Sequence, residues 1–350
     1  MNGLNSTTNL GVLVKQGLAL LFLPLFTSLV VPQTGAAEVT LLNVSYDVTR
    51  EFYQDFNPAF EAYWKATNGD TVVVSQSHGG SSAQARAVVD GLEADVVTMN
   101  QPLDIDLLFE HGHLVPKNWQ TRLPNRSVPY NSTIVFVVRK GNPKHIQNWD
   151  DLVRSSVSVV VPNPKTSGNG RYSYLAAWGN ALKKSNGNEK QAREFVTKLF
   201  ANVPVLDAGG RGATTTFAQN GIGDVLLTFE NEAHLILRQF PDAGLELVVP
   251  PASILAENPV AWVDKNVNRH GTAKVARAYL DYLFSDEGQE LAAKHYFRPA
   301  SEAILAEHAD QFKPLELFTV DEVFGGWAQA QKVHFADGGV FDQIYQNNKL

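Results

Sequence analysis

The sequence predicts an α/β protein with two lobes, each a mainly parallel sheet flanked by helices. Short apolar, β-branched runs alternate with amphipathic stretches, and this alternation starts a second time near residue 132. In addition, small and hydroxyl residues fill three of the loops that lead from a predicted strand into a predicted helix.

The first series of elements runs from residue 39 to residue 98. Strands are expected over 39–44, 71–75 and 95–98, and helices over 50–66 and 83–91. In the first helix, aromatic side chains recur at helical spacing and are expected to face the core: Phe52, Phe56, Phe60 and Tyr63.

The second series repeats the pattern over residues 132–229. It predicts strands over 132–138, 156–161, 203–206 and 224–229, and helices over 171–184, 189–200 and 213–220. Beyond it we expect strands over 245–249 and 260–263 and a helix over 272–285.

We expect the chain to cross between lobes near 123–130 and near 229–235. Lobe 1 would then hold residues 38–123 and 235–299, and lobe 2 residues 124–234. Residues 300–350 would form a C-terminal helical segment that packs on the lobes.

Residues 1–37 have the pattern of an export signal. Lys15 precedes an apolar run over 17–31, and small residues at Gly35 and Ala37 end the segment. A membrane anchor is the alternative, but the run is shorter than the roughly 20 residues of a membrane span and contains Pro24. We expect cleavage after about Ala37 and a periplasmic mature protein.

The composition argues against several classes of function. A formal net charge of −7 disfavours nucleic-acid binding, which needs a basic face. The absence of cysteine excludes disulfides, thiolate metal ligands and a cysteine nucleophile.

The three loops cover residues 77–82, 164–170 and 208–213. The first N–H groups of a helix have no partner inside the helix, and the helix dipole places partial positive charge there. Glycine lets an anion approach these groups closely, and a serine hydroxyl adds a donor. Ordinary capping explains any single loop, but three such loops at strand ends indicate an anion site.

Other candidate sites have weaker support. His78 and Ser81 lie in a segment similar to an esterase oxyanion loop, but no Gly-x-Ser-x-Gly motif accompanies it. His111 and His113 lack a third metal ligand at a typical spacing, so we expect a solvated turn there and neither metal nor cofactor. We interpret Asp150 and Asp151 as helix caps.

Together with their neighbours, these loops resemble the sulfate- and thiosulfate-binding proteins of bacterial ABC importers. The matching stretches span essentially the whole chain after residue 37: 42–47 (LNVSYD), 76–81 (QSHGGS), 93–98 (EADVVT), 138–144 (VRKGNPK), 162–168 (PNPKTSG), 174–179 (YLAAWG), 209–212 (GGRG) and 320–327 (VDEVFGGW).

The resemblance implies a type II periplasmic binding protein fold whose lobes close over a dianion. It also implies a monomer that meets the membrane permease subunits of an ABC importer. The anion-binding positions it implies are Asp47, Ser81, Ser167, Gly168, Asn169, Gly210 and Phe229. We expect Arg211, as a partner of Asp47, and Gly80 to support these contacts without touching the anion.

Two of these positions depart from the sulfate-binding pattern. Asn169 stands where a second glycine is usual. Its backbone N–H can still serve as a donor if the local φ suits asparagine. Phe229 stands where sulfate binders offer an indole N–H, and it has no donor.

These features favour a carrier of sulfate, with thiosulfate as a second ligand, over an enzyme. Three alternatives stay open: a thiosulfate-selective binder, a binder of another oxyanion, and an exported hydrolase that uses Ser81 and His78.

Overall fold

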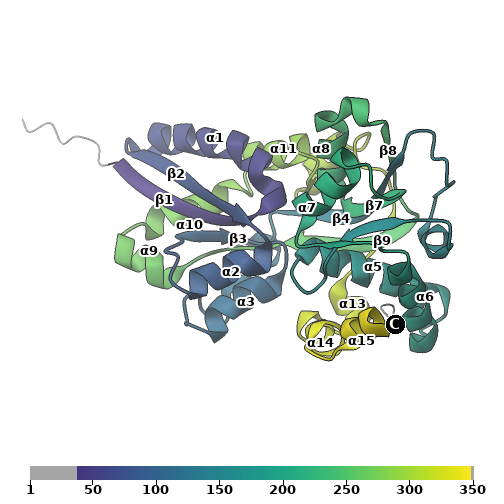
Figure 1. The fold of residues 1–350 in the computed structure, drawn as a ribbon. Coiled ribbons are helices and arrows are strands. Elements are labelled where there is room, and N and C mark those ends of the chain that lie inside the picture. The colour runs from purple at the N-terminus through teal and green to yellow at the C-terminus, as the bar shows by residue number, and fades with distance from the viewer. Residues whose placement is uncertain (1–37, 348–350) are drawn as a thin grey trace, which may run out of the picture. The chain divides into compact units, whose positions relative to one another are not determined.

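Two sheets organise residues 38–347, the part of the chain that the computed structural model describes. The first sheet has the order β10-β3-β1-β2, with β10 Val260–Trp262, β3 Val96–Thr98, β1 Glu38–Tyr46 and β2 Thr71–Gly79. β1 runs parallel to β2 and β3, and Tyr46 pairs with Gly79 while Ser45 pairs with Thr98. The carboxyl ends of these three strands therefore meet at one edge of the sheet (Figure 1).

Helices cover both faces of the first sheet. They are α1 Arg50–Asn68, α2 Ser81–Val89, α3 Pro102–Glu110, α9 Asp264–His270, α10 Ala273–Tyr282 and α11 Asp286–Lys294. Leu41 and Val96 face the core that α1 and α10 share, whereas Val44 and Val97 face the core that α2 and α3 share. This period of two is what a sheet buried on both faces requires.

The second sheet has the order β12-β9-β4-β7-β5-β6, and β8 and β11 also pair with β4. Its strands are β4 Tyr130–Arg139, β5 Val159–Pro162, β6 Leu206–Asp207, β7 Val225–Phe229, β8 Leu245–Val248, β9 Ala252–Asn258, β11 Arg298–Pro299 and β12 Glu316–Phe318. β4 runs antiparallel to β7, β8, β9 and β11, so this sheet is mixed rather than mainly parallel.

The second sheet is also covered on both faces. Its helices are α5 Gly168–Lys184, α6 Glu189–Ala201, α7 Gly210–Thr214 and α8 Glu230–Gln239. Val135 and Val137 of β4 pack with α7 and α8, and Ile134 and Phe136 share a core with α5.

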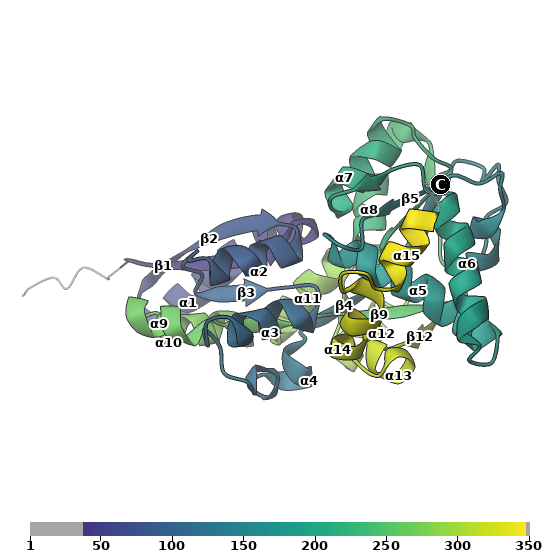
Figure 2. The ribbon, with the colours of Figure 1, turned by 60° about the horizontal axis from the view of Figure 1, so that its bottom comes forward.

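Short helices form most of the segment after residue 300. They are α12 Glu302–Glu307, α13 Val320–Phe324, α14 Trp327–Ala330, the π-helical turn Gln331–Phe335 and α15 Val340–Asn347. In Figure 2, α15 lies beside α6, where Phe341 meets Phe200 at 5.3 Å between ring centroids. The remaining short elements are η1 Asp47–Thr49, η2 Trp119–Thr121, α4 Pro124–Ser127, η3 Trp149–Val153, the π-helical turn Thr215–Gln219 and η5 Pro241–Ala243.

The α/β class with two helix-flanked sheets is confirmed, while several details differ from expectation. Tyr63 is 44% exposed, so its placement in the core was wrong. The strand expected over 203–206 is reduced to Leu206–Asp207, and the helix expected over 213–220 starts at Gly210 and becomes π-helical at Thr215.

The expected lobe boundaries stay a prediction, but three strands conflict with them. β8, β9 and β11 pair with β4, which places residues 245–258 and 298–299 in the second sheet rather than with lobe 1. The expected export signal lies outside the described residues. Within residues 38–347, no helix combines the length and apolar character that crossing a membrane requires.

Candidate functional site

Each of the three glycine-containing loops leads directly into a helix, and the first two also contain serine. α2 starts at Ser81 behind Gly80, α5 starts at Gly168 behind Ser167, and α7 starts at Gly210 behind Gly209. A fourth segment, η1, starts at Asp47 where β1 ends. The sequence therefore predicted the position of these helix starts within three residues.

These segments lie close together, although η1 and α2 follow strands of the first sheet and α5 and α7 follow strands of the second. A Cβ added to Gly80 in the first loop would lie 3.6 Å from the carbonyl oxygen of Thr166 in the second loop. The first two loops are therefore close neighbours. A Cβ on Gly210 would lie 3.6 Å from Val48 Cγ1 and 3.1 Å from Asn169 Nδ2. The starts of α5 and α7 thus adjoin each other, and the start of η1 adjoins α7.

The groups that these segments offer are mainly hydrogen-bond donors. Gly168, Asn169 and Gly210 are first or second residues of their helices, so their N–H groups have no partner inside the helix. Ser167 Oγ accepts a hydrogen bond from Gly170 N at 3.3 Å, which leaves the hydroxyl hydrogen available. Ser81 Oγ accepts from Asn100 N at 3.2 Å and donates to Met99 Sδ, a weak acceptor, at 3.6 Å.

Asn169 has no unusual backbone angle, because it is not among the positive-φ residues and lies in the first turn of α5. Its side chain is 3% exposed and joins two elements: Nδ2 donates to Thr228 Oγ1 at 3.0 Å, and Oδ1 accepts from Ser173 Oγ at 3.3 Å. The side chain of Asn169 therefore links the start of α5 to Thr228 of β7 by a hydrogen bond that a glycine could not form.

Phe229 ends β7 and is 1% exposed. Its ring meets Tyr172 edge-on at 5.8 Å, and Tyr172 in turn meets Trp327 at 5.0 Å. The indole Nε1 of Trp327 is buried without a hydrogen-bond partner among the described residues. The ring of Phe229 therefore contributes apolar packing and no donor.

Asp47 is held at the start of α7. The backbone N–H groups of Arg211, Asp47 itself and Val48 lie near its carboxylate and act to lower its pKa. Burial raises the pKa of Asp47, and the nearby Arg211 guanidinium opposes that rise. Arg211 therefore lies near Asp47, but its guanidinium pairs with Glu51 and Glu232, and its expected role as a partner of Asp47 stays a prediction.

The Arg211 guanidinium bridges α1 and α8. It donates to Glu51 Oε2 at 3.2 Å and lies 3.6 Å from Glu232 Oε2. Glu232 is fully buried, and its other oxygen accepts from Thr214 Oγ1 at 2.9 Å. Burial raises the pKa of Glu232 to about 7, with Arg211 acting in the opposite direction.

Comparison with known proteins places this arrangement in a family. Residues 41–298 match the bacterial extracellular solute-binding proteins. This chain is a member of that family. It is 60% identical over 316 residues to a protein of Pseudomonas aeruginosa named "Thiosulfate-binding protein", covering 90% of this chain and 95% of the relative. It is 55% identical over 309 residues to a protein of Salmonella typhimurium named "Sulfate-binding protein", covering 88% and 94%.

A solved structure supports the same fold for this solute-binding protein. The sulfate-binding protein SubI from Mycobacterium tuberculosis H37Rv superimposes with a TM-score of 0.77 at 32% identity, covering 84% of this chain and 98% of that chain.

Sequence reasoning missed several polar residues of this solute-binding protein that adjoin the helix starts. Asn100 is 4% exposed, and its Oδ1 has no hydrogen-bond partner among the described residues. A Cβ added to Gly168 would lie 2.1 Å from that oxygen. Asp104 is buried beside the start of α2, where Ser82 Oγ donates to it at 2.8 Å. The position of Asn100 just after β3 was the available signal, since ligands bind at strand ends in α/β sheets.

The other candidate sites have structural explanations in this solute-binding protein. His78 Nδ1 lies 3.4 Å from the Tyr46 carbonyl oxygen, and the hydrogen bonds of Ser81 involve Met99 and Asn100 rather than His78. Asp151 caps η3 by accepting from Asn148 N at 3.0 Å, which confirms its expected role. Asp150 instead pairs with Lys184. His111 and His113 lie exposed at the end of α3, and no three-residue cluster of metal-ligating side chains occurs within residues 38–347.

Proposed function

We propose that this protein is an exported carrier that binds sulfate, and also thiosulfate, and delivers it to the membrane permease of an ABC importer. The observation that carries the proposal is that the starts of α2, α5 and α7 adjoin one another and η1, although they come from two sheets. The named functions of the 60% and 55% identical relatives support the choice of anion.

The proposed site binds a dianion with neutral donors. Backbone N–H groups of Asp47, Gly168, Asn169 and Gly210 and the hydroxyls of Ser81 and Ser167 would donate to its oxygens. The partial positive charge at each helix start contributes about 0.3–1 kcal/mol, and each charge-assisted hydrogen bond about 1.5–3 kcal/mol. Each of these groups would act as a donor to the anion, so we expect the site to favour a dianion without a proton over protonated phosphate.

Isothermal titration calorimetry on the mature protein tests the proposal. We expect sulfate to bind at micromolar concentration or below, thiosulfate to compete with it, and phosphate at neutral pH to have no effect. Absence of sulfate and thiosulfate binding would refute the proposal. Hydrolysis of aryl sulfate or phosphate esters that is lost in Ser81→Ala would instead support the hydrolase alternative.

Phe229 bears on which of the two anions is preferred. We expect Phe229→Trp to favour sulfate over thiosulfate, because an indole N–H adds a donor that the sulfur of thiosulfate needs less. One charge-assisted hydrogen bond corresponds to about tenfold or more in relative affinity. Since Phe229 is 1% exposed and packs on Tyr172, Phe229→Leu serves as a control for altered packing. An unchanged preference in Phe229→Trp would show that this side chain does not face the anion.

A further inference from the structure

Lys165 lies in the second of the three loops, yet the proposed anion site does not use its charge. Its ammonium instead contacts the C-terminal segment, residues 300–347. Nζ donates to the carbonyl oxygen of Phe335 at 3.0 Å and to Asp337 Oδ1 and Asp342 Oδ2, both at 3.1 Å. The carbonyl oxygen of Ala336 lies 3.4 Å from Nζ. An ammonium group has three N–H donors, so these acceptors leave none for an anion.

Two of these acceptors are well fixed. The side chain of Asp342 is largely buried, and its Oδ2 also accepts a hydrogen bond from Gly338 N at 2.9 Å. Phe335 is buried and ends the π-helical turn Gln331–Phe335. The last carbonyl groups of a helical turn have no partner within it, and lysine side chains commonly bind them. Asp337, by contrast, is fully exposed, and an ion pair of that kind contributes little.

The C-terminal segment is anchored independently of Lys165. The buried ring of Phe341 meets Phe200 of α6 at 5.3 Å and Tyr174 of α5 at 5.9 Å between ring centroids. The hydroxyl of Tyr174 lies 2.9 Å from His334 Nδ1. Apolar packing of this kind holds the segment on α5 and α6, so it can serve as a fixed support for a flexible loop.

On the other side of the contact, the backbone around Lys165 leads directly to the proposed ligands. Lys165 N donates to Asn163 Oδ1 at 2.9 Å, and Ser167 N donates to the Asn163 carbonyl oxygen at 2.9 Å. Between them, Thr166 Oγ1 donates to the carbonyl oxygen of Ala208 in the third loop at 2.9 Å. A displacement of residue 165 would therefore reach the hydroxyl of Ser167 and also the third loop.

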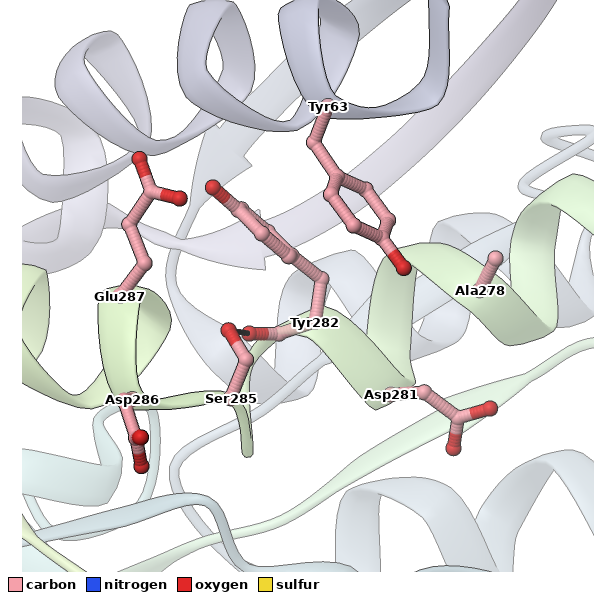
Figure 3. A pocket seen from close by; sticks show the side chains of 7 residues that line it. All are labelled: Tyr63, Ala278, Asp281, Tyr282, Ser285, Asp286 and Glu287. Carbon is pink, nitrogen blue, oxygen red and sulfur yellow. Dashed lines mark hydrogen bonds between the residues drawn. The ribbon is translucent and has the colours of Figure 1, made fainter. Parts of the chain in front are cut away.

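Converging acceptors around one cation are not a general result of the acidic composition. Three acidic side chains, Asp281, Asp286 and Glu287, line a pocket between α1, α10 and the start of α11. In Figure 3 their carboxylates point in different directions. The acceptors at Lys165 instead meet at a single nitrogen atom. This arrangement indicates a defined attachment point for the second loop.

We propose that Lys165 is a positioning residue for the anion site. It fastens the second loop to the C-terminal segment, and so holds the N–H groups of Gly168 and Asn169 and the hydroxyl of Ser167 in place without touching the anion. Donors that are ordered before binding save the free energy of ordering them when the anion arrives. The C-terminal segment then contributes to anion affinity although none of its residues binds the anion. This proposal rests on the function proposed above.

The test is isothermal titration calorimetry of sulfate on the mature protein and on Lys165→Met, which removes the ammonium and keeps most of the side-chain length. We expect sulfate to bind Lys165→Met about tenfold more weakly than the parent. Lys165→Arg, which can still pair with Asp342, should recover part of the loss. A lysine that only held α15 in place would lower the thermal stability and leave the sulfate affinity at the parent value.

Asp342→Asn alters the other partner of the contact and serves if Lys165→Met does not fold. It should weaken sulfate binding about threefold. The double variant Lys165→Met/Asp342→Asn should bind sulfate as Lys165→Met does, because the first substitution has already removed the contact.

Lys183→Met is the matched control. Lys183 lies at the opposite end of α5 from the second loop and also pairs with the C-terminal segment, through Glu316. Its removal should leave the sulfate affinity unchanged. If the parent binds sulfate and Lys165→Met binds it equally well, only the role of Lys165 is overturned. The same holds if Lys183→Met loses as much affinity, or if the losses of the two single variants multiply in the double variant. If the parent binds neither sulfate nor thiosulfate, the function proposed above fails and this proposal fails with it.

Discussion

At the scale of single residues, Gly168 is a point of close approach between the start of α5 and Asn100, which follows β3. A Cβ at this position would lie 2.1 Å from Asn100 Oδ1. We therefore expect Gly168→Ala to push Asn100 or the start of α5 aside, and to weaken sulfate binding about tenfold or more through lost donor geometry. Overpacking should also cost about 1–3 kcal/mol of the free energy of unfolding. Calorimetry and urea denaturation measure the two effects.

The double variant Gly168→Ala/Asn100→Ala is the control for this clash. Shortening Asn100 removes the oxygen that the new methyl group meets, so part of the unfolding free energy should return. If the double variant is no more stable than Gly168→Ala alone, steric contact with Asn100 is not the cause.

Glu232 makes stability depend on pH. Its pKa is raised from 4.5 to about 7, so between these values the folded state binds more protons than the unfolded state. The free energy of unfolding should therefore fall as pH rises from about 4.5 to about 7, by about 3 kcal/mol for this group. Glu232→Gln has no proton to lose and should remove that fall.

Urea denaturation at pH 5 and pH 8 measures this difference. Burial also raises the pKa of Asp47 and Asp104, so the informative quantity is the difference between parent and variant. Glu302→Gln, which alters an exposed carboxylate, should keep the parent slope. An identical slope in Glu232→Gln would show that Glu232 is ionised at pH 5.

At the scale of elements, Ser167 serves as both a helix cap and a proposed ligand. Its hydroxyl accepts from Gly170 N, as the hydroxyl of Ser301 accepts from Ile304 N at the start of α12. Loss of either cap should cost about 1 kcal/mol of the free energy of unfolding. Ser167→Ala should in addition weaken sulfate binding about tenfold, whereas Ser301→Ala should leave it unchanged. Calorimetry and thermal denaturation of both variants separate capping from binding, and equal sulfate affinities would remove Ser167 from the site.

The elements themselves were largely predictable, because apolar periodicity is a local property of the sequence. The strands of the first sheet and helices α1, α2, α5 and α6 follow from it. α8 was missed although its sequence is amphipathic: it begins directly after β7, without a side-chain cap to mark its start. α3 was missed although Pro102 at its first turn was an available signal.

The candidate site was predictable only where its chemistry is local. Gly80, Ser167, Gly168 and Gly210 stand out because glycine and serine precede predicted helices. The contacts of Asn100 with Gly168, and of Glu51 and Glu232 with Arg211, join segments far apart in the sequence. No local sequence pattern indicates such pairs. Local patterns also gave no indication that β8 and β9 join the second sheet.

At the scale of the whole molecule, the Arg211–Glu51 ion pair joins α7 of the second sheet to α1, which packs on the first. The guanidinium donates to both carboxylate oxygens, at 3.5 and 3.2 Å, and Gln239 of α8 adds a contact to Glu51 at 3.4 Å. If the lobes separate without the anion, as the resemblance implies, this pair breaks when they open. It would then favour the closed state in which the helix starts adjoin.

We expect Glu51→Gln to weaken sulfate binding about threefold, because a partly exposed ion pair contributes at most about 1 kcal/mol. The loss should appear mainly as faster sulfate dissociation, measured by stopped-flow tryptophan fluorescence. Asp55→Asn is the matched control, since Asp55 lies on the same helix but pairs with Lys294 and His295 of the α11 region, at 2.7 and 2.9 Å. Equal dissociation rates in the two variants would show that the Arg211–Glu51 pair does not help to hold the two sheets together around the anion.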